Sequence, residues 1–250
     1  MSSCSTSRPS TPGRRAGAFP LPPGGGLLDV TATFGFLAAA TTRVRLGTGV
    51  ALVPQRNPIY TAKEVCTLDW LSGGRIDFGI GAGWNKEEVE ICGYRWEDRG
   101  ARCNEFLEVM RRLWTEPVVD FNGKWVRCET ARLDPKPIQK PHVPIIVGGY
   151  AEAAYARAVR YGAGWYGFNR DPAGVKENLR QLDAAFAQAG RTRPSGFDII
   201  ITPPMSMPMD VMPAYGDLGV HRLVLNLGGQ RPEQVDKRLP EIGRLVKRAA

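Results

Sequence analysis

Hydrophobic residues recur along this chain at two spacings, one typical of strands and one typical of helices. Residues 44–53 (VRLGTGVALV) are rich in β-branched residues and predict a strand that glycines interrupt. The next stretch, NPIYTAKEVCTLDWLSGGR, begins with Asn57 as a possible cap and Pro58 at the first helical position, and its apolar residues follow at helical spacing. It predicts a helix that ends at Gly73 and Gly74.

The same alternation of strand and helix continues to the end of the chain. Further helices are predicted at residues 29–42, 99–114, 151–161, 172–189, 210–218 and 232–248. Further strands are predicted at residues 75–80, 144–149, 164–168, 197–202 and 222–227. One face of the second helix in that series carries the predicted core residues Cys103, Phe106, Leu107, Met110 and Leu113. Residues 115–143, rich in proline and polar residues with FNGKW as a hairpin candidate, are predicted to be an insertion.

Short apolar strands that alternate with amphipathic helices predict an α/β fold, in which helices cover parallel strands. Both an open doubly wound sheet and a closed barrel fit this rhythm. Glycines at the carboxyl ends of several strands favour the TIM (β/α)8 type, because loops at that end build the active site. Such a barrel has eight strands and the pattern yields six strand–helix units, so we expect an incomplete barrel that lacks its first two units.

The barrel domain is expected to span residues 27–250, with the insertion at about 115–143. Residues 1–26 contain no acid and are built mainly from Ser, Thr, Pro, Gly and Arg. Such a segment cannot bury enough apolar surface to offset the conformational entropy that it would lose on ordering. We therefore expect residues 1–26 to be disordered, or an atypical start to the chain.

Charge and cysteine usage narrow the possible functions. Lysine and arginine number 33 against 25 acidic residues, but the basic residues form no stripe with interleaved aromatics, so we expect no nucleic-acid interface. The five cysteines include no CxxC pair and the two histidines lie at no metal-binding spacing, so we expect reduced thiols, a cytoplasmic location and no metal site. No apolar run approaches the roughly 18 residues of a membrane span, and no stretch resembles a signal-peptide core.

The stretch GRIDFGIGAGWNKEEVE, residues 74–90, carries glycines inside and just after a predicted strand. Its GxGxG spacing differs from the GxGxxG of dinucleotide-binding folds and is a weak signal for them. Gly81 and Gly83 nevertheless indicate close approach to the backbone, which a flat ring lying over the strand ends would explain. Asn85 and Glu88 resemble a capping box, and capping alone would account for the acids at this helix start.

A second pair of glycines, Gly148 and Gly149, leads directly into a predicted helix. Unpaired first-turn amides, from Tyr150 to Ala153, make this helix start a candidate anion site. A simple tight turn is the alternative explanation for the same glycines. The backbone of Gly164 and Trp165, at the next strand, is expected to support a bound phosphate.

Four segments, in one consistent order between about Asp29 and Leu227, carry a family resemblance. They are TTRVRLGTGVALVPQRNPIYTAKEVCTLDWLSGGRIDFGIGAGW, DRGARCNEFLEVMRRLW, LDPKPIQKPHVPIIVGG and RYGAGWYGF. Together they resemble the luciferase-like monooxygenase superfamily, especially its deazaflavin (coenzyme F420)-dependent oxidoreductases. The resemblance implies a (β/α)8 barrel that binds a flavin or deazaflavin at the carboxyl ends of its strands.

The resemblance also implies which residues bind the cofactor. The ring is expected near Thr48, Gly49, Val50, Gly81 and Gly83. The phosphate is expected at Gly148, Gly149 and the following helix start, Tyr150 and Ala151, supported by Gly164 and Trp165. The family carries a non-prolyl cis peptide bond beneath the ring, and the matching bond here joins Gly49 to Val50. An ordinary glycine bulge is the alternative reading of that position.

Family members begin with two strand–helix units that supply part of the substrate pocket, and residues 1–26 have no counterpart to them. The resemblance therefore assigns no catalytic residue, and His142 and His221, each just before a predicted strand, are expected to be structural. Three functions stand as alternatives: an F420-dependent oxidoreductase acting on a small organic substrate, an FMN-dependent monooxygenase, and a truncated barrel without activity. Exposed edges of an open barrel would favour a homodimer.

Overall fold

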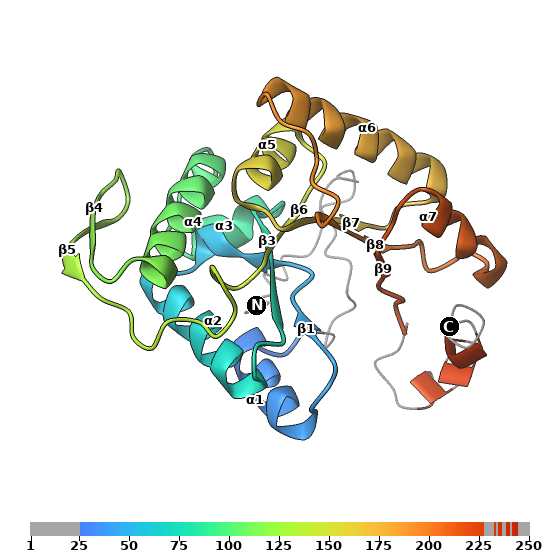
Figure 1. The fold of residues 1–250 in the computed structure, drawn as a ribbon, viewed down its shortest axis with the longest axis horizontal. Coiled ribbons are helices and arrows are strands. Elements are labelled where there is room, and N and C mark those ends of the chain that lie inside the picture. Colours follow the sequence, from blue (N-terminus) through green and yellow to red (C-terminus); the bar gives the residue numbers. More distant parts are fainter. Residues whose placement is uncertain (1–25, 228–232, 234, 237–238, 241, 245–250) are drawn as a thin grey trace, which may run out of the picture. The chain divides into compact units, whose positions relative to one another are not determined.

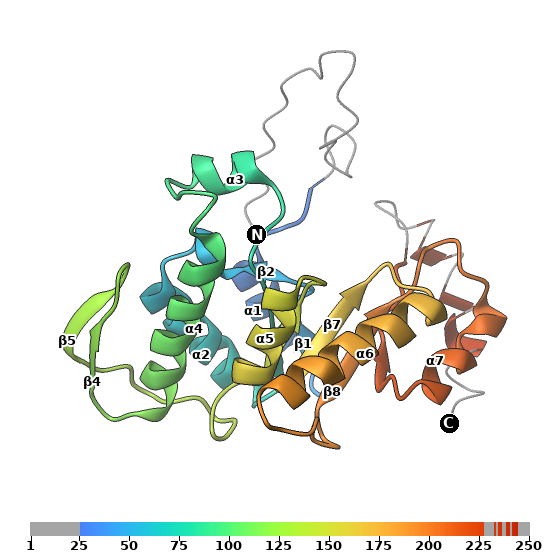
Figure 2. The ribbon, with the colours of Figure 1, turned by 90° about the horizontal axis from the view of Figure 1, so that it is seen from above.

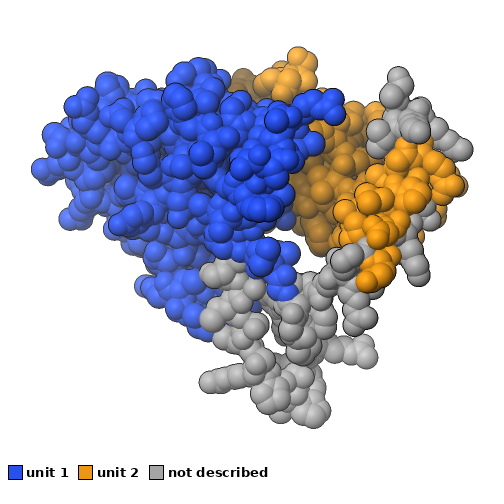
Figure 3. All heavy atoms as spheres, turned by 90° about the horizontal axis from the view of Figure 1, so that it is seen from below, with its two compact units in different colours: residues 1–145 blue, residues 146–250 orange. Residues whose placement is uncertain are grey.

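The structure of the protein is a computed structural model that describes residues 26–227, 233, 235–236, 239–240 and 242–244. The chain divides into two compact units, Met1–Ile145 and Ile146–Ala250, which Figure 3 shows in different colours. Each unit contains parallel strands and the helices that accompany them. The alternation of strands and helices confirms the predicted α/β class.

The parallel strands of the first unit meet at β3 (Ile76–Gly81), which is buried along its whole length. Both β1 (Leu46–Gly47) and β2 (Ala51–Leu52) pair with β3 in the parallel direction. The predicted strand at 44–53 is therefore two short strands, and residues 48–50 form the break between them.

Glycine at position 79 lets the backbone of this break approach the middle of β3. A Cβ atom added to Gly79 would lie 1.7 Å from the carbonyl oxygen of Thr48, which is closer than any two nonbonded atoms can come. The Thr48 hydroxyl also donates a hydrogen bond of 2.5 Å to the Gly79 carbonyl oxygen. This glycine is therefore required by packing within the protein.

The helices of the first unit begin and end at the predicted signals. α1 (Val30–Ala40) starts after Asp29, whose carboxylate accepts hydrogen bonds of 3.0 Å from two first-turn amides. α2 (Pro58–Ser72) starts after Asn57 and ends at Gly73, which is in the left-handed conformation. The other helices of this unit are η1 (Val53–Gln55), α3 (Lys86–Ile91) and α4 (Arg99–Thr115). α2 contacts both α1 and α4 and lies between them (Figure 1).

The predicted insertion contains an antiparallel hairpin of β4 (Val119–Asn122) and β5 (Arg127–Ala131), as expected from the FNGKW stretch. Glu105 on α4 holds the turn of this hairpin, because its carboxylate accepts hydrogen bonds of 2.7–2.9 Å from the amides of residues 124–126. The five predicted core residues of α4 are all buried. The insertion is thus fastened to a helix that is itself part of the core.

The second unit contains a parallel sheet in the order β6–β7–β8–β9. Its strands are β6 (Ile145–Gly148), β7 (Gly164–Phe168), β8 (Asp198–Thr202) and β9 (Arg222–Leu223). Its helices are α5 (Glu152–Tyr161), α6 (Pro172–Gln188), α7 (Pro213–Asp217) and the short 3-10 helix η2 (Met209–Val211). α5 and α6 pack against each other on one side of the strands (Figures 1 and 2).

The carboxyl-terminal predictions were only partly right. The strand predicted at 222–227 is limited to β9, and the helix predicted at 210–218 divides into η2 and α7, because Pro213 begins a new helix. Most of the segment predicted at 1–26 and of the helix predicted at 232–248 lies outside the described residues. Within the described part of the chain, no helix is both long and apolar enough to cross a membrane.

Candidate functional site

A hollow of about 410 Å³ opens in the first unit beside the break between β1 and β2. One wall consists of residues 47–51, and the opposite wall consists of the start of α1 and residues 26–28. Its volume falls within the range of small-molecule sites. Three of the residues predicted to lie near the ring, Thr48, Gly49 and Val50, line this hollow.

The strand wall of the hollow has an irregular backbone. The peptide bond between Gly49 and Val50 is cis, as the family resemblance predicts. The Val50 side chain lies over the neighbouring strand, because a Cβ atom added to Gly81 would be 2.7 Å from Val50 Cγ2. The chain itself thus explains the glycine at position 81.

Gly83 has a different reason to be glycine. Its φ of 90° lies in a region that side chains disfavour, whereas a Cβ atom there would meet its neighbours only at ordinary distances of 3.6–3.9 Å. Neither Gly81 nor Gly83 is among the described residues that line the hollow. The close approach that the sequence argument ascribed to a ring is therefore made by the protein at position 81, and contact of either glycine with a ring stays a prediction.

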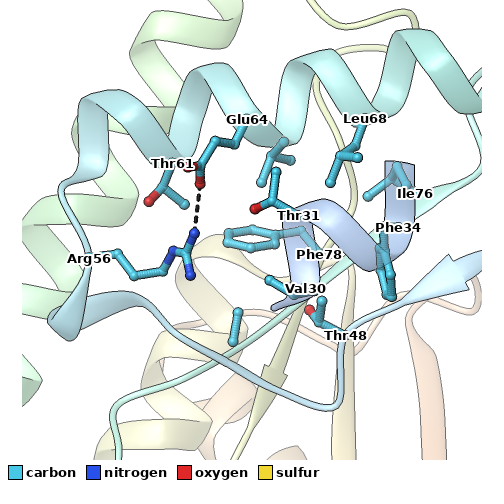
Figure 4. A pocket seen from close by; sticks show the side chains of 12 residues that line it. Val30, Thr31, Phe34, Thr48, Arg56, Thr61, Glu64, Leu68, Ile76 and Phe78 are labelled. Carbon is cyan, nitrogen blue, oxygen red and sulfur yellow. Dashed lines mark hydrogen bonds and ion pairs between the residues drawn. The ribbon is translucent and has the colours of Figure 1, made fainter. Parts of the chain in front are cut away.

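A smaller cavity of about 20 Å³ lies next to the hollow and shares Val30, Phe34 and Thr48 with it. Figure 4 shows the guanidinium of Arg56 directed at the carboxylate of Glu64, at a distance of 2.7 Å. This cavity has room for about one water molecule, so it is too small for a cofactor or a substrate.

The acids after β3 lie where the capping interpretation expects them. Asn85 is the N-cap of α3 and accepts a hydrogen bond of 3.2 Å from the amide of Glu87, which lies with Glu88 in the first turn. Burial raises the pKa of the Glu88 carboxyl, and the nearby Gln55 side chain opposes that rise. Helix capping is therefore sufficient to explain these acids.

The predicted anion site of the second unit is a glycine turn followed by a helix without a side-chain cap. Gly148 ends β6, and Gly149 follows with φ of 127°, which favours glycine. α5 begins at Glu152, one residue later than predicted, with Ala151 at the N-cap position. No side chain of the described residues caps this helix start, which suits its first amides to bind water or an anion.

The next strand supports this turn in a way that differs from the prediction. Gly164 is the first residue of β7 and pairs with Ile146, so it lies at the amino end of the sheet, away from Gly149. A Cβ atom there would lie 2.6 Å from the Asp198 carbonyl oxygen, so strand packing explains this glycine. Trp165 is fully buried, and its indole N–H donates a hydrogen bond of 2.9 Å to the Gly149 carbonyl oxygen. Its side chain therefore fixes the turn.

Arg170, which the sequence argument missed, lies beside the same turn. Its guanidinium carbon is 3.7 Å from the centre of the Tyr150 ring, and its Nε is buried without a hydrogen-bond partner among the described residues. Its backbone is held on both sides, because its amide donates to the Thr202 carbonyl oxygen at 3.2 Å and its carbonyl accepts from the Tyr215 hydroxyl at 2.7 Å. A fixed cation with an unsatisfied donor is suited to bind an anion.

Tyr150 completes this arrangement as a neutral partner. Its hydroxyl donates to the Phe168 carbonyl oxygen. Burial raises the pKa of Tyr150, and the nearby Arg170 guanidinium opposes that rise. The Tyr150 ring therefore offers its face to the guanidinium and carries no charge that would compete with an anion.

The two histidines have structural contacts, in line with the expectation for both. His142 Nδ1 lies 2.8 Å from the Val143 carbonyl oxygen, and its ring packs beside Trp114. His221 Nδ1 accepts a hydrogen bond of 3.0 Å from the Ile199 amide. Within the described parts of the chain, no three His, Cys, Asp or Glu side chains gather as metal ligands would.

Comparisons with known proteins agree with this fold. The family model for luciferase-like monooxygenases matches residues 16–211. An uncharacterised protein of Mycobacterium tuberculosis is 34% identical over 201 residues, which cover 80% of this chain and 70% of that protein. The FMNH2-dependent dimethylsulfone monooxygenase of Pseudomonas putida is 31% identical over 169 residues, which cover 66% of this chain and 46% of that enzyme.

A solved structure shows the same likeness at the level of the fold. The coenzyme F420-dependent tetrahydromethanopterin reductase of Methanopyrus kandleri matches with a TM-score of 0.62 at 22% identity, over 70% of this chain and 54% of that one. This chain thus spans about half the length of both named enzymes. Since the family model covers most of its sequence, the chain belongs to the luciferase-like monooxygenase family, whose relatives include both FMN- and F420-dependent enzymes.

Proposed function

We propose that the protein is an oxidoreductase that binds coenzyme F420 and exchanges a hydride with a small organic substrate. Family membership supports a cofactor of the flavin type. The hollow beside Thr48, Gly49 and Val50 carries the proposal, because its volume suits a small molecule and it lies at the residues where the family resemblance expects the ring.

The first unit is suited to hold a flat ring. Glycines at positions 47 and 49 leave the backbone of one wall uncovered, and the Thr48 hydroxyl is turned to the Gly79 carbonyl oxygen. Val50 is braced against Gly81, which fixes the floor of the hollow. A planar apolar molecule can therefore lie against this wall without displacing a side chain.

The second unit, taken by itself, is suited to bind an anion such as a phosphate. The turn at Gly148 and Gly149, the uncapped start of α5 and the unsatisfied Nε of Arg170 all offer donors. Arg170 lies against Tyr150, the residue that follows the turn. Together these donors are suited to bind a phosphate group, or a carboxylate on the same ligand.

The chain positions the reactants, and the cofactor supplies the redox chemistry. When bound, F420 provides a ring carbon that accepts or delivers a hydride. The apolar residues around the hollow exclude water from this carbon, while the strand wall fixes the face on which a substrate can lie. We assign no acid or base.

The second candidate function is an FMN-dependent monooxygenase. The observation in its favour is the 31% identity to the FMNH2-dependent dimethylsulfone monooxygenase of Pseudomonas putida. The hollow of the first unit would serve the ring of FMN as well as that of F420, because both cofactors carry a tricyclic ring. Reduced FMN would then react with oxygen, so the two functions differ in whether oxygen is consumed.

Titration of the purified chain with F420, FMN and riboflavin tests both candidates, with cofactor fluorescence as the readout. We expect F420 to bind more tightly than FMN. Tighter binding of FMN, with oxygen consumption when reduced FMN is supplied, would favour the monooxygenase. Binding of none of the three would contradict the proposal and favour a barrel without activity.

Arg170→Gln tests the assignment of the anionic tail in the same titration. Loss of a charged hydrogen bond predicts roughly 10- to 100-fold weaker binding of F420 and FMN. Riboflavin, which lacks the phosphate, should be unaffected. The matched control is Arg180→Gln, which removes the same charge from a surface pair with Glu177 in the same unit. Equal effects of both variants on FMN and riboflavin would contradict the assignment.

A further inference from the structure

We propose that the hollow of the first unit selects an uncharged, largely apolar substrate. This inference rests on the proposed function, because it concerns the substrate that would lie against the ring in the same hollow. It adds the chemical class of that substrate, which the family does not specify.

The walls of the hollow carry no ionisable side chain among the described residues. The strand wall contributes glycine, threonine, valine and alanine, and the helix wall is formed mainly by Leu27, Leu28, Val30 and Phe34. A charged group that entered would lose its hydration without gaining a partner, and this loss is costly. An apolar group would instead leave water at no such cost.

The ion pair of the adjacent small cavity does not line the hollow. Arg56 and Glu64 line the adjacent small cavity, where they bind each other at 2.7 Å (Figure 4). Neither residue lines the hollow, and the side chains of Val30 and Phe34 are shared between the two spaces. A substrate carboxylate or amine would therefore meet the apolar side chains and not this pair.

Two hydroxyl side chains, Thr33 and Thr48, line the hollow, and the Thr48 oxygen favours a substrate hydroxyl over a carboxylate. Thr48 uses its proton in the 2.5 Å hydrogen bond to the Gly79 carbonyl oxygen, so its oxygen is left as an acceptor toward the hollow. A substrate alcohol can donate to this oxygen. A carboxylate, which only accepts, cannot.

The rim of the hollow is apolar as well. Leu27 and Leu28 are 65% and 81% exposed, although leucine gains free energy from burial. An apolar molecule bound in the hollow would cover part of this surface. The exposed leucines of the rim and the charge-free walls thus favour the same class of ligand, an uncharged and largely apolar molecule.

The test compares 1-octanol, octanoate and octylammonium, which share one chain length and differ in the charge of the head group. Binding to the purified chain is measured by ligand-observed NMR, with and without F420. We expect 1-octanol to bind at least 10-fold more tightly than either ion. Equal affinity of octanoate, or no binding of 1-octanol below its solubility limit, would overturn the inference.

Leu28→Lys supplies the complementary test, because it places a cation on the rim at an exposed position that is expected to tolerate the change. We expect it to raise the affinity for octanoate at least fivefold relative to 1-octanol. The matched control is Leu71→Lys on α2, which changes another exposed leucine of the same unit that does not line the hollow. An equal response of both variants would contradict the inference.

The same samples separate this inference from the proposed function. If F420 binds but octanoate binds as tightly as 1-octanol, the inferred substrate class is wrong and the cofactor assignment stands. If F420 does not bind, the proposed function falls, and the selectivity of the hollow for 1-octanol is still read directly from the free chain.

Discussion

Asp29 is an example of a single side chain that sets where a helix begins. Asp29→Ala removes the acceptor for two first-turn amides of α1 and should lower the free energy of unfolding by about 1 kcal/mol at pH 7. Urea denaturation measures this change. Asp29→Asn, which keeps a side-chain acceptor, is the control and should stay within a few tenths of a kcal/mol of the wild type.

The pH dependence of the same residue follows from its pKa. Backbone hydrogen bonds, that from the Ala32 amide first, lower the pKa of Asp29 in the folded state. Its charge-dependent stabilisation is therefore present above the unfolded pKa and is lost as pH falls through the folded one. The wild type should lose stability relative to Asp29→Asn over that acidic range. A difference that does not change with pH would contradict this account.

Residue roles were predictable where the signal is local in the chain. Asp29, Asn57 and Asn85 act as helix caps because the amides that they bind follow within three residues. The reason for Gly81 could not be read in this way, since its partner Val50 lies in the break between β1 and β2 and meets it only through the pairing of β2 with β3. Arg170 was missed because one cation in a basic sequence resembles ordinary surface charge until its contacts are known.

At the scale of elements, the β4–β5 hairpin depends on one carboxylate from a helix. Glu105→Ala removes the acceptor for the three turn amides of residues 124–126. Loss of bonds to a charged acceptor predicts roughly 10- to 100-fold faster hydrogen exchange at these amides. Hydrogen exchange followed by NMR measures the change residue by residue.

A matched control for this prediction lies on the same helix. Glu108→Ala removes an acid whose 2.5 Å pair with Arg111 lies partly exposed on α4. Such a pair contributes about 0–1 kcal/mol, so exchange at residues 124–126 should not change. Faster exchange in both variants would mean that general weakening of α4, and not loss of the hairpin contact, is responsible.

Element types and order could be predicted from the sequence, but some boundaries could not. Hydrophobic spacing identified the helices α2, α4 and α6 because each carries apolar residues that recur at helical spacing over four turns or more. The strand at 44–53 was predicted as one strand that glycines interrupt, whereas the structure has two short strands, β1 and β2, on either side of the break. The strand predicted at 222–227 was longer than β9, because the pairing with β8 ends before the run of apolar residues does.

For the whole molecule, cofactor binding should appear as thermal stabilisation. A ligand at 100 times its dissociation constant stabilises the folded state by about 2.7 kcal/mol, which raises Tm by about 5–10 °C for a chain of this size. Differential scanning fluorimetry with F420 at increasing concentration measures this rise. No change in Tm at saturation, in a chain shown to be folded, would contradict cofactor binding to the native state.

The family could be identified from the sequence because four segments occur in one consistent order, and the family match over residues 16–211 confirms it. The choice between F420 and FMN could not be made in the same way. Both cofactors present a flat ring and an anionic tail, and the anion site that we propose at Gly148 and Gly149 does not distinguish one tail from the other. The substrate depends on the side chains that surround a hollow, which only the three-dimensional arrangement of α1 and the β1–β2 break reveals.

The contact between Gly79 and Thr48 has a consequence for anyone who reads mutational scans of this protein. Because a Cβ atom at position 79 would lie 1.7 Å from a carbonyl oxygen, even alanine should be rejected there. In an activity screen, Gly79 would thus score like a residue that contacts the substrate, although its own contact is with the backbone of Thr48 in the break between β1 and β2. Measuring protein abundance alongside turnover would reveal the difference, because variants at this position should disappear from the soluble fraction before any catalytic defect can be seen.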